Sequence, residues 1–235
     1  VLDAFASKDT LNKSPNLDLR INSVLINRGK IFYDVLSESE TPGELNGSHL
    51  GIHDLSASIS LKALRNDSVH AIVRRLAFEE KSGFRLDKLC AKLISDNKRL
   101  NLNDFTIKLP TSALTLDSVE VRYDSLQNLS KLTDAVHFKG VLNGNFVLKD
   151  IAPIIPVFKE MHRPLKKKFA FNGQGKNLEV PLLSLSDNRH LDIKGYGSVV
   201  NWDANRDMFL QAQLSNLSIT KAGISYFMNA GRCEM

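Results

Sequence analysis

The chain has 235 residues, of which 43% are hydrophobic and 24% are charged, and its net charge at pH 7 is +5. This composition is typical of a folded protein and excludes a disordered or collagen-like chain. Two cysteines, Cys90 and Cys233, are too few for a disulfide scaffold. The longest nearly apolar run, residues 151–158, is far shorter than the about 20 residues that a membrane helix needs.

The predicted elements are mostly short strands, because apolar and polar residues alternate along much of the chain. Turn residues separate the runs, as at Arg28–Gly29, Asn143–Gly144 and Asn172–Gly173, and such short connections favour antiparallel neighbours. About fourteen strands spaced by roughly 4.8 Å would form a sheet on the order of 65 Å long. In chain order, the stretches that read as strands cover residues 17–26, 30–35, 50–61, 69–78, 84–93, 100–109, 114–123, 136–148, 168–171, 178–185, 191–200, 208–214 and 212–219.

Five of these strands share one pattern, in which the alternation stops at a polar pair and then resumes. In a regular strand, the extra residue would move the second half of the apolar residues to the other face of the sheet. A bulge or bend at the pair restores one apolar face and increases the local twist, so repeated pairs predict a sheet curved into a trough. The pairs are His53–Asp54, Asp87–Lys88, Asn103–Asp104, Asp117–Ser118 and Ser215–Asn216.

Two short helices are expected among the strands. Asp150 is a candidate cap for a proline-containing helix over residues 150–161, and Thr220 is a candidate cap for a helix over residues 220–229. Each follows a strand directly, which suggests a repeat of roughly 70 residues made of several strands and a helix. We expect two such segments, residues 1–124 and 125–235, in one continuous sheet, with a loop or single helical turn between them.

Motifs for catalysis or cofactor binding are not found in the sequence. His49 and His53 are four residues apart in a strand pattern, which is too far for a shared metal without further ligands, so we expect two exposed or edge histidines. The glycines near Gly175 and Gly197 complete no phosphate-binding loop. We therefore expect a protein that is not an enzyme and that uses no metal or cofactor.

The basic residues give a weaker signal. The densest basic stretch contains Arg163, Lys166, Lys167 and Lys168, but a proline splits it and few aromatic residues surround it. Nucleic-acid-binding modules usually combine such charge with stacking aromatics, so we expect no nucleic-acid partner. The stretch is either a solvated loop or a patch that contacts lipid head groups.

Three segments resemble the recurrent strands of TamB-like and AsmA-like proteins. Residues 17–34 resemble the family's strand pair with a Tyr-Asp ending, and residues 141–158 resemble its strand followed by a proline-containing helix. Residues 171–178 resemble the strand that resumes the sheet, although an insertion that is usual before its Asn-Leu element is shortened here. The match covers most of the chain, and the order of the segments carries it more than any single motif does.

The resemblance implies a mainly β fold, an elongated, curved antiparallel sheet of the β-taco or β-groove type. It also implies a periplasmic protein of outer-membrane biogenesis that is anchored in the inner membrane by an N-terminal helix. Its partners would be phospholipid and an outer-membrane barrel of the TamA type. Because the chain starts at Val1 without a signal peptide, we expect it to be an internal piece of such a protein, lacking the anchor and the barrel-binding region.

The apolar side chains of the strand pattern are the candidate site, a groove that shields acyl chains. Two other interpretations stay open: the same side chains could fill the core of a closed β-sandwich, or the chain could be a β-helix that acts as an extracellular binding or adhesion module. The candidate groove residues are Phe84, Leu86, Leu89, Leu100, Leu102, Phe105, Ile107, Leu114, Leu116, Val119 and Val121.

Overall fold

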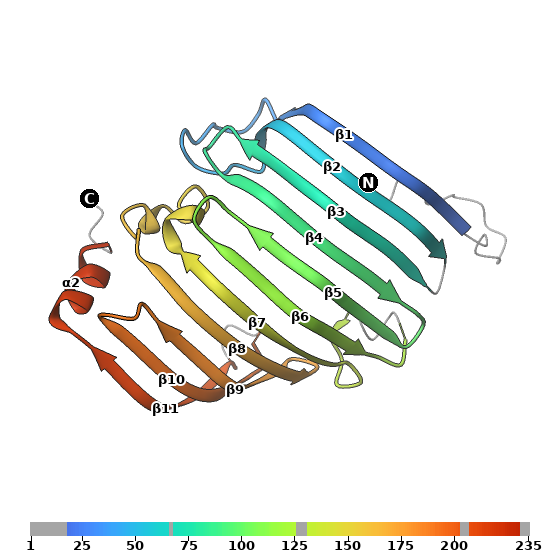
Figure 1. Cartoon of the computed structure of the whole chain (residues 1–235). Coiled ribbons are helices and arrows are strands. Elements are labelled where there is room, and N and C mark those ends of the chain that lie inside the picture. Colours follow the sequence, from blue (N-terminus) through green and yellow to red (C-terminus); the bar gives the residue numbers. More distant parts are fainter. Residues whose placement is uncertain (1–17, 66–67, 126–130, 203–206, 231–235) are drawn as a thin grey trace.

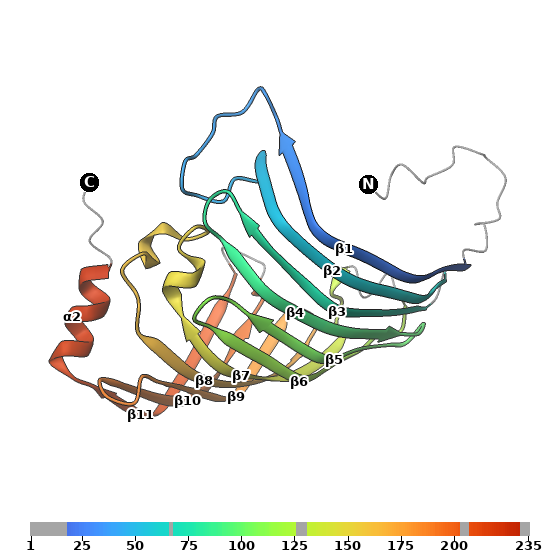
Figure 2. The ribbon, with the colours of Figure 1, turned by 45° about the horizontal axis from the view of Figure 1, so that its top comes forward.

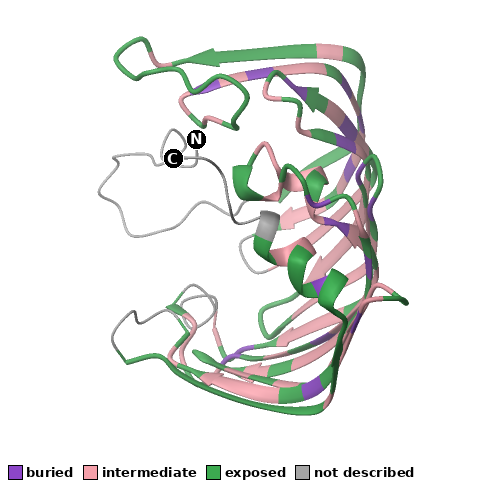
Figure 3. Cartoon of the chain, turned by 90° about the vertical axis from the view of Figure 1, so that its left-hand side faces the viewer, coloured by how far each residue is buried: buried purple, intermediate pink, exposed green. Residues whose placement is uncertain are grey.

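The protein is a single antiparallel sheet of 11 strands, in which each strand pairs with the next one in the sequence (Figure 1). The computed structural model describes residues 18–65, 68–125, 131–202 and 207–230. The sheet is open and curves into a trough (Figures 2 and 3). The predicted fold class is therefore confirmed, and neither a closed sandwich nor a parallel β-helix is present in these residues.

The strands are long, so that the sheet is wide as well as extended. Their bounds are β1 (Asp18–Asp34), β2 (His49–Arg65), β3 (Val69–Glu80), β4 (Arg85–Ser95), β5 (Arg99–Lys108), β6 (Ala113–Arg122), β7 (His137–Val147), β8 (Pro164–Gln174), β9 (Asn177–Ser186), β10 (Leu191–Val200) and β11 (Phe209–Ile219).

Each of the five polar pairs coincides with a change of register, as the sequence pattern predicts. In β6, for example, Asp117–Ser118 lies opposite the single residue Val141 of β7. Asp54 and Asp104 have left-handed backbone angles, with φ of 50° and 53°. Such bulges bend a strand and increase its twist, which accounts for the curvature of the sheet. The register changes at all five pairs.

The predicted number of strands is too high, because glycine-containing pairs that read as turns lie inside strands. Arg28–Gly29 lies within β1, where Arg28 has a φ of 53° and the register shifts, so the two strands expected over residues 17–35 are one. Asn143–Gly144 lies within β7 and Asn172–Gly173 within β8. Gly is permissive enough for a turn or a bulge, and the neighbouring strand decides between them.

The helices agree only in part with the prediction. Residues 221–230 form the helix α2 (Lys221–Ala230), and the Thr220 hydroxyl accepts a hydrogen bond from the Gly223 amide, as a cap does. The helix expected over residues 150–161 is wrong: that segment holds two 3-10 turns, η2 (Leu148–Ile151) and η3 (Pro156–Phe158). Asp150 does not cap a helix there. No helix in the described part of the chain is long and apolar enough to cross a membrane.

The sheet continues across the boundary expected near residue 125. β6 and β7 pair over most of their length on either side of it. The predicted segments 1–124 and 125–235 thus contribute strands to one continuous sheet. That they are units of a longer repeat stays a prediction. Residues 126–130 of the connecting loop lie outside the described residues.

Candidate functional site: an apolar face of the curved sheet

Residues that lie opposite each other on neighbouring antiparallel strands share a face of the sheet, so the register defines rows that run across the strands. One row crosses all 11 strands, and its members are apolar except for one serine and one glycine. Row 1 consists of Leu19, Leu64, Val69, Ser95, Leu100, Val121, Phe138, Gly173, Leu178, Val199 and Leu210.

Three further rows run beside row 1. Row 2 crosses β1 to β8 and consists of Ile21, Leu61, Ala71, Leu93, Leu102, Val119, Gly140 and Phe171. Row 3 crosses β5 to β11 and consists of Phe105, Leu116, Leu142, Phe169, Leu183, Gly195 and Leu214. Row 4 crosses all 11 strands and consists of Ile26, Ala57, Leu76, Leu89, Ile107, Leu114, Gly144, Lys167, Leu185, Ile193 and Leu217.

The four rows lie on the same face, which we name the apolar face. β7 shows this directly, because Phe138, Gly140, Leu142 and Gly144 each belong to a different row and follow one another at every second residue. Alternate residues of a strand point to the same side of a sheet. Six residues of an extended strand span about 20 Å, so the apolar face is about that wide.

The candidate groove residues lie where the sequence pattern places them. Ten belong to β4, β5 and β6, and eight of these form four facing pairs: Leu100–Val121, Leu102–Val119, Phe105–Leu116 and Ile107–Leu114. Leu89 lies opposite Ile107, and Leu86 is buried opposite Phe78. Phe84 lies outside the strands, in the β3–β4 turn, with its ring 6.1 Å from the Phe78 ring. Leu86 is buried, and the other ten candidate groove residues are half-buried.

Among the described residues, no second sheet covers the apolar face. Large apolar side chains therefore stay in contact with solvent, above all on the two edge strands (Figure 3). Leu217 on β11 is 58% exposed, and Ile26 on β1 is 37% exposed, although both belong to row 4. A contiguous apolar surface of this kind marks an interaction or ligand site in a folded protein.

At two of the glycines in the rows, an aromatic ring from the neighbouring strand covers the backbone. The Phe171 ring lies over Gly140, and the Phe138 ring lies over Gly173, so that a methyl group added to either glycine would come within 2.5 Å of a ring carbon. The two rings also contact each other, with centroids 6.5 Å apart. Sequence reasoning misses this arrangement, because Gly173 reads as a turn residue and no local pattern pairs a ring of the next strand with Gly140.

The opposite face of the same strands is charged. Glu120 on β6 forms ion pairs with Arg122 and with Lys139 of β7, whose amine is 3.1 Å away. Hydrogen bonds from Arg122 and Lys139 hold the pKa of Glu120 below its ordinary value. The sheet thus has one apolar and one polar face, as the alternation predicts.

The four residues of the predicted basic patch do not share one surface. Lys166 and Lys168 are exposed and point to the polar face, whereas Lys167 is half-buried and belongs to row 4. The guanidinium of Arg163, the residue directly before β8, stacks on the Tyr226 ring of α2 at 4.2 Å. The strand alternation therefore divides the stretch, and three consecutive lysines cannot act together on one ligand.

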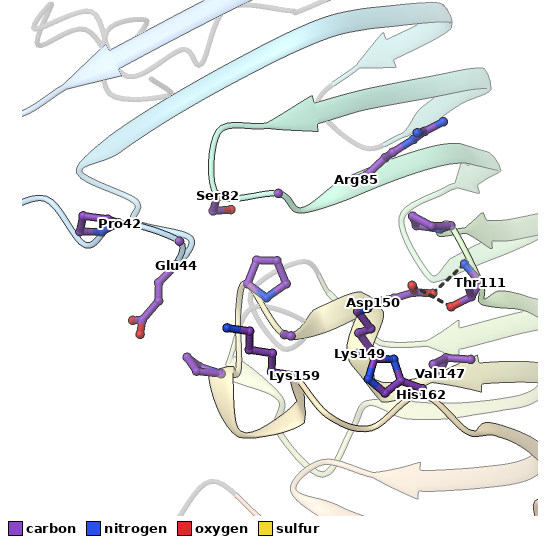
Figure 4. Close-up of a pocket in the computed structure, with 16 residues that line it drawn as sticks. Pro42, Glu44, Ser82, Arg85, Thr111, Val147, Lys149, Asp150, Lys159 and His162 are labelled. Carbon is purple, nitrogen blue, oxygen red and sulfur yellow. Dashed lines mark hydrogen bonds between the residues drawn. The ribbon is translucent and has the colours of Figure 1, made fainter. Parts of the chain in front are cut away.

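A pocket of about 740 Å³ opens at the end of the sheet where β1–β2, β3–β4, β5–β6 and β7–β8 are connected (Figure 4). Lys149, Lys159 and His162 come from the segment that contains η2 and η3, and Glu44 comes from the β1–β2 loop. The Leu45 amide donates to the Pro153 carbonyl at 2.6 Å, which joins these two distant segments. Sequence reasoning does not find this pocket, because its walls come from four separate loops.

Asp150 fixes the η2–η3 segment to the β5–β6 turn. Its carboxylate accepts hydrogen bonds from the Thr111 amide at 3.0 Å and the Thr111 hydroxyl at 2.9 Å (Figure 4), and from the Ser112 hydroxyl at 2.5 Å. The Ser112 side chain is buried and also accepts a hydrogen bond from the Val147 amide. One carboxylate therefore sets the position of one wall of the pocket.

Replacing Asp150 by asparagine is expected to loosen this wall without unfolding the sheet. Loss of the charged acceptor should cost about 1–2 kcal/mol, so amides within residues 148–161 should exchange with deuterium about tenfold faster. Hydrogen–deuterium exchange with mass spectrometry measures this, and Glu44→Gln on the facing loop is the control. Equal exchange in both variants would contradict the anchoring role.

A cluster of three residues at the start of β2 has the composition of a metal site. The ligand atoms of Asp34, Glu40 and His49 lie within 4.8 Å of one another. His49 is buried, and its Nδ1 is 3.2 Å from Asp34 while its Nε2 is 3.0 Å from the Glu38 carbonyl. Because protein groups already contact both ring nitrogens, we interpret His49 as an anchor for the β1–β2 loop. The expectation of an exposed or edge position is wrong for this histidine.

Comparisons of the chain with models of protein families, with curated proteins and with solved structures found no match. The apolar face is therefore interpreted from its own geometry.

Proposed function

We propose that this chain is part of a non-enzymatic lipid carrier, whose apolar face forms a groove that binds the acyl chains of phospholipid. The observation that carries the proposal is the continuity of rows 1 and 4, which cross all 11 strands on one face with no covering layer among the described residues. Burial of each methylene of an acyl chain contributes about 0.8 kcal/mol, so such a surface can hold lipid without a polar site.

Two features support the inner, concave side as the apolar one. Bulges recur from strand to strand and curve the sheet; the bulge of β4 lies beyond row 4, and those of β5 and β6 lie between rows 2 and 3. Lys167 points to the apolar face and is half-buried, whereas Lys166 and Lys168 point to the other face and are exposed. Side chains inside a trough have protein on several sides, and side chains outside it do not.

The resemblance to TamB-like and AsmA-like proteins extends this proposal. The carrier would then be periplasmic and would act in outer-membrane biogenesis, moving phospholipid between the membranes or aiding the assembly of outer-membrane proteins. An N-terminal membrane anchor and an outer-membrane barrel partner of the TamA type would belong to other regions of the protein. These statements stay predictions.

The test introduces a charge into the groove. Ile107 is half-buried in row 4, so the carboxylate of Ile107→Asp stays hydrated and the sheet should fold, while lipid contact at this position is lost. Thr115→Asp on the polar face of β6 is the matched control. Native mass spectrometry of protein purified gently from membranes should show phospholipid with the wild type and the control, and at least tenfold less with Ile107→Asp.

Two results would contradict the proposal. The first is a wild-type protein that never carries phospholipid after gentle purification. The second is a circular dichroism spectrum showing that Ile107→Asp unfolds the chain, because that outcome is expected of a closed core and not of an open groove.

A further inference from the structure

Lys167 is the single charged side chain in the four rows of the apolar face. It interrupts row 4 between Gly144 and Leu185, while the same row is otherwise made of aliphatic residues and one glycine. Its neighbours on the same face of β8 are Leu165 and Phe169, and Phe171 follows two residues further on. A lysine at this place conflicts with the pattern of every other strand in the sheet.

The surroundings of the Lys167 amine are apolar on the protein side. The amine lies 4.3 Å from the centre of the Phe146 ring, and the residue directly opposite Lys167 on β7 is Gly144, which offers no polar side chain. No ion pair involves Lys167 within the described ranges. Burial lowers the pKa of its amine, as expected where a cation is shielded from water without an anion nearby.

We propose that Lys167 binds the phosphate of a phospholipid whose acyl chains lie on the apolar face. This inference rests on the proposed function. The ring of Phe146 lies on one side of the amine, and no ion pair within the described ranges competes with a phosphate for its charge. A phosphodiester carries one negative charge and compensates one ammonium group, so the half-buried amine would gain the counter-ion that it lacks.

The width of the apolar face favours a phospholipid over a ligand with a single chain. Rows 1 and 3 lie beside row 4 on both β8 and β9, and row 2 also reaches β8, so that the face extends about 20 Å along each strand from row 4 to row 1. Two acyl chains can lie side by side on such a surface with the head group at Lys167. A fatty acid with one chain would leave most of the width uncovered.

The test separates the charge from the apolar contacts by using three fluorescent lipids with the same acyl chain. They are phosphatidylglycerol, diacylglycerol without a phosphate, and the free fatty acid. The variants are Lys167→Met, which keeps the length of the side chain and removes its charge, Lys167→Arg, which keeps the charge, and Lys168→Met, which removes an equal charge from the polar face.

We expect Lys167→Met to bind phosphatidylglycerol about tenfold more weakly than the wild type and to bind diacylglycerol equally well. Lys167→Arg and Lys168→Met should bind both lipids as the wild type does. An equal loss of both lipids in Lys167→Met, or an equal loss of phosphatidylglycerol in both methionine variants, would overturn the inference. So would an effect of Lys167→Met on the fatty acid alone.

The same experiment distinguishes this inference from the proposed function. If the wild type binds all three lipids and no variant differs, the groove stands and the role of Lys167 is wrong. If the wild type binds none of them, the proposed function fails. Circular dichroism melts of the three variants ensure that a loss of binding is not a loss of folding.

Discussion

Replacing Gly144 by alanine is expected to lower the midpoint of thermal unfolding by about 5–15 °C. Gly144 lies inside β7 and has a φ of +147°, a backbone conformation that residues other than glycine rarely adopt. A Cβ atom there would come within 2.1 Å of the Ala113 carbonyl oxygen and within 2.9 Å of the Leu114 Cα atom. Both are backbone atoms of β6, so no side-chain rotation can relieve the clash.

Two costs combine at this position. Backbone strain of this type costs about 1–3 kcal/mol, and overpacking against a fixed neighbour costs about 1–3 kcal/mol more. The lower entropy of the unfolded alanine chain offsets only about 0.4–1 kcal/mol of this. The sum destabilises the β6–β7 ladder, which joins the two halves of the sheet.

Gly47→Ala is the matched control for this prediction. Gly47 lies in the β1–β2 loop, its φ is not in the left-handed region, and nothing lies within 4 Å of the position that a Cβ atom would take. The melting temperature of the Gly47→Ala variant, measured by circular dichroism or calorimetry, should stay near that of the wild type. If the Gly144→Ala variant has the same melting temperature as the Gly47→Ala control, β6 and β7 do not approach each other as the structure shows.

Glu80→Gln is expected to destabilise the protein by about 1–3 kcal/mol at pH 7. The Glu80 side chain ends β3 and is only 2% exposed. Its carboxylate accepts hydrogen bonds from the Gly51 amide at 3.0 Å and from the Ser82 amide at 2.8 Å, and it thereby joins β2 to the β3–β4 turn. A glutamine oxygen is a weaker acceptor, and its amino group would face a donor.

The effect of this substitution should depend on pH with a definite sign. Burial raises the pKa of Glu80, but hydrogen bonds from Ser82 and from the Gly51 and Lys81 amides lower it by more, so the pKa lies below its ordinary 4.5. A carboxyl group whose pKa is lower in the folded state stabilises the fold above the unfolded pKa. This stabilisation is lost as the pH falls through the folded pKa.

Urea unfolding of the wild type and of Glu80→Gln at a series of pH values checks this. The difference in the free energy of unfolding should be constant from pH 7 down to about pH 5 and should shrink below about 4.5. Glu79→Gln, on the exposed neighbour, should show no such difference. A gap between wild type and Glu80→Gln that widens on acidification would contradict the role given to the carboxylate.

Much of the fold could be predicted from the sequence because the strands carry their own register signals. The pair Asp117–Ser118 interrupts an alternating run, and the structure has a bulge at that point. The apolar residues on either side of the pair, Leu116 and Val119, accordingly share a face with Phe105 and Leu102. A periodicity with a regular interruption thus defines both the apolar face and the curvature of the sheet.

Other features depend on contacts that no local pattern contains. Gly144 and Gly173 read as turn residues, and the strands opposite them are what keep them in extended ladders. Asp150 reads as a helix cap, but it accepts hydrogen bonds from Thr111 and Ser112. Ser112 is 38 residues away in the sequence, in the β5–β6 turn. The pocket beside it requires four loops to meet, and only the curvature of the sheet brings them together.

The strictly sequential order of the strands has a consequence for the evolution of the protein. Because each strand pairs only with the strands before and after it in the sequence, a hairpin can be added or removed without changing the partner of any other strand. Each such change lengthens or shortens the sheet by about 9.6 Å, twice the spacing between strands. Gene duplication of a short segment is therefore sufficient to adjust how far the protein reaches.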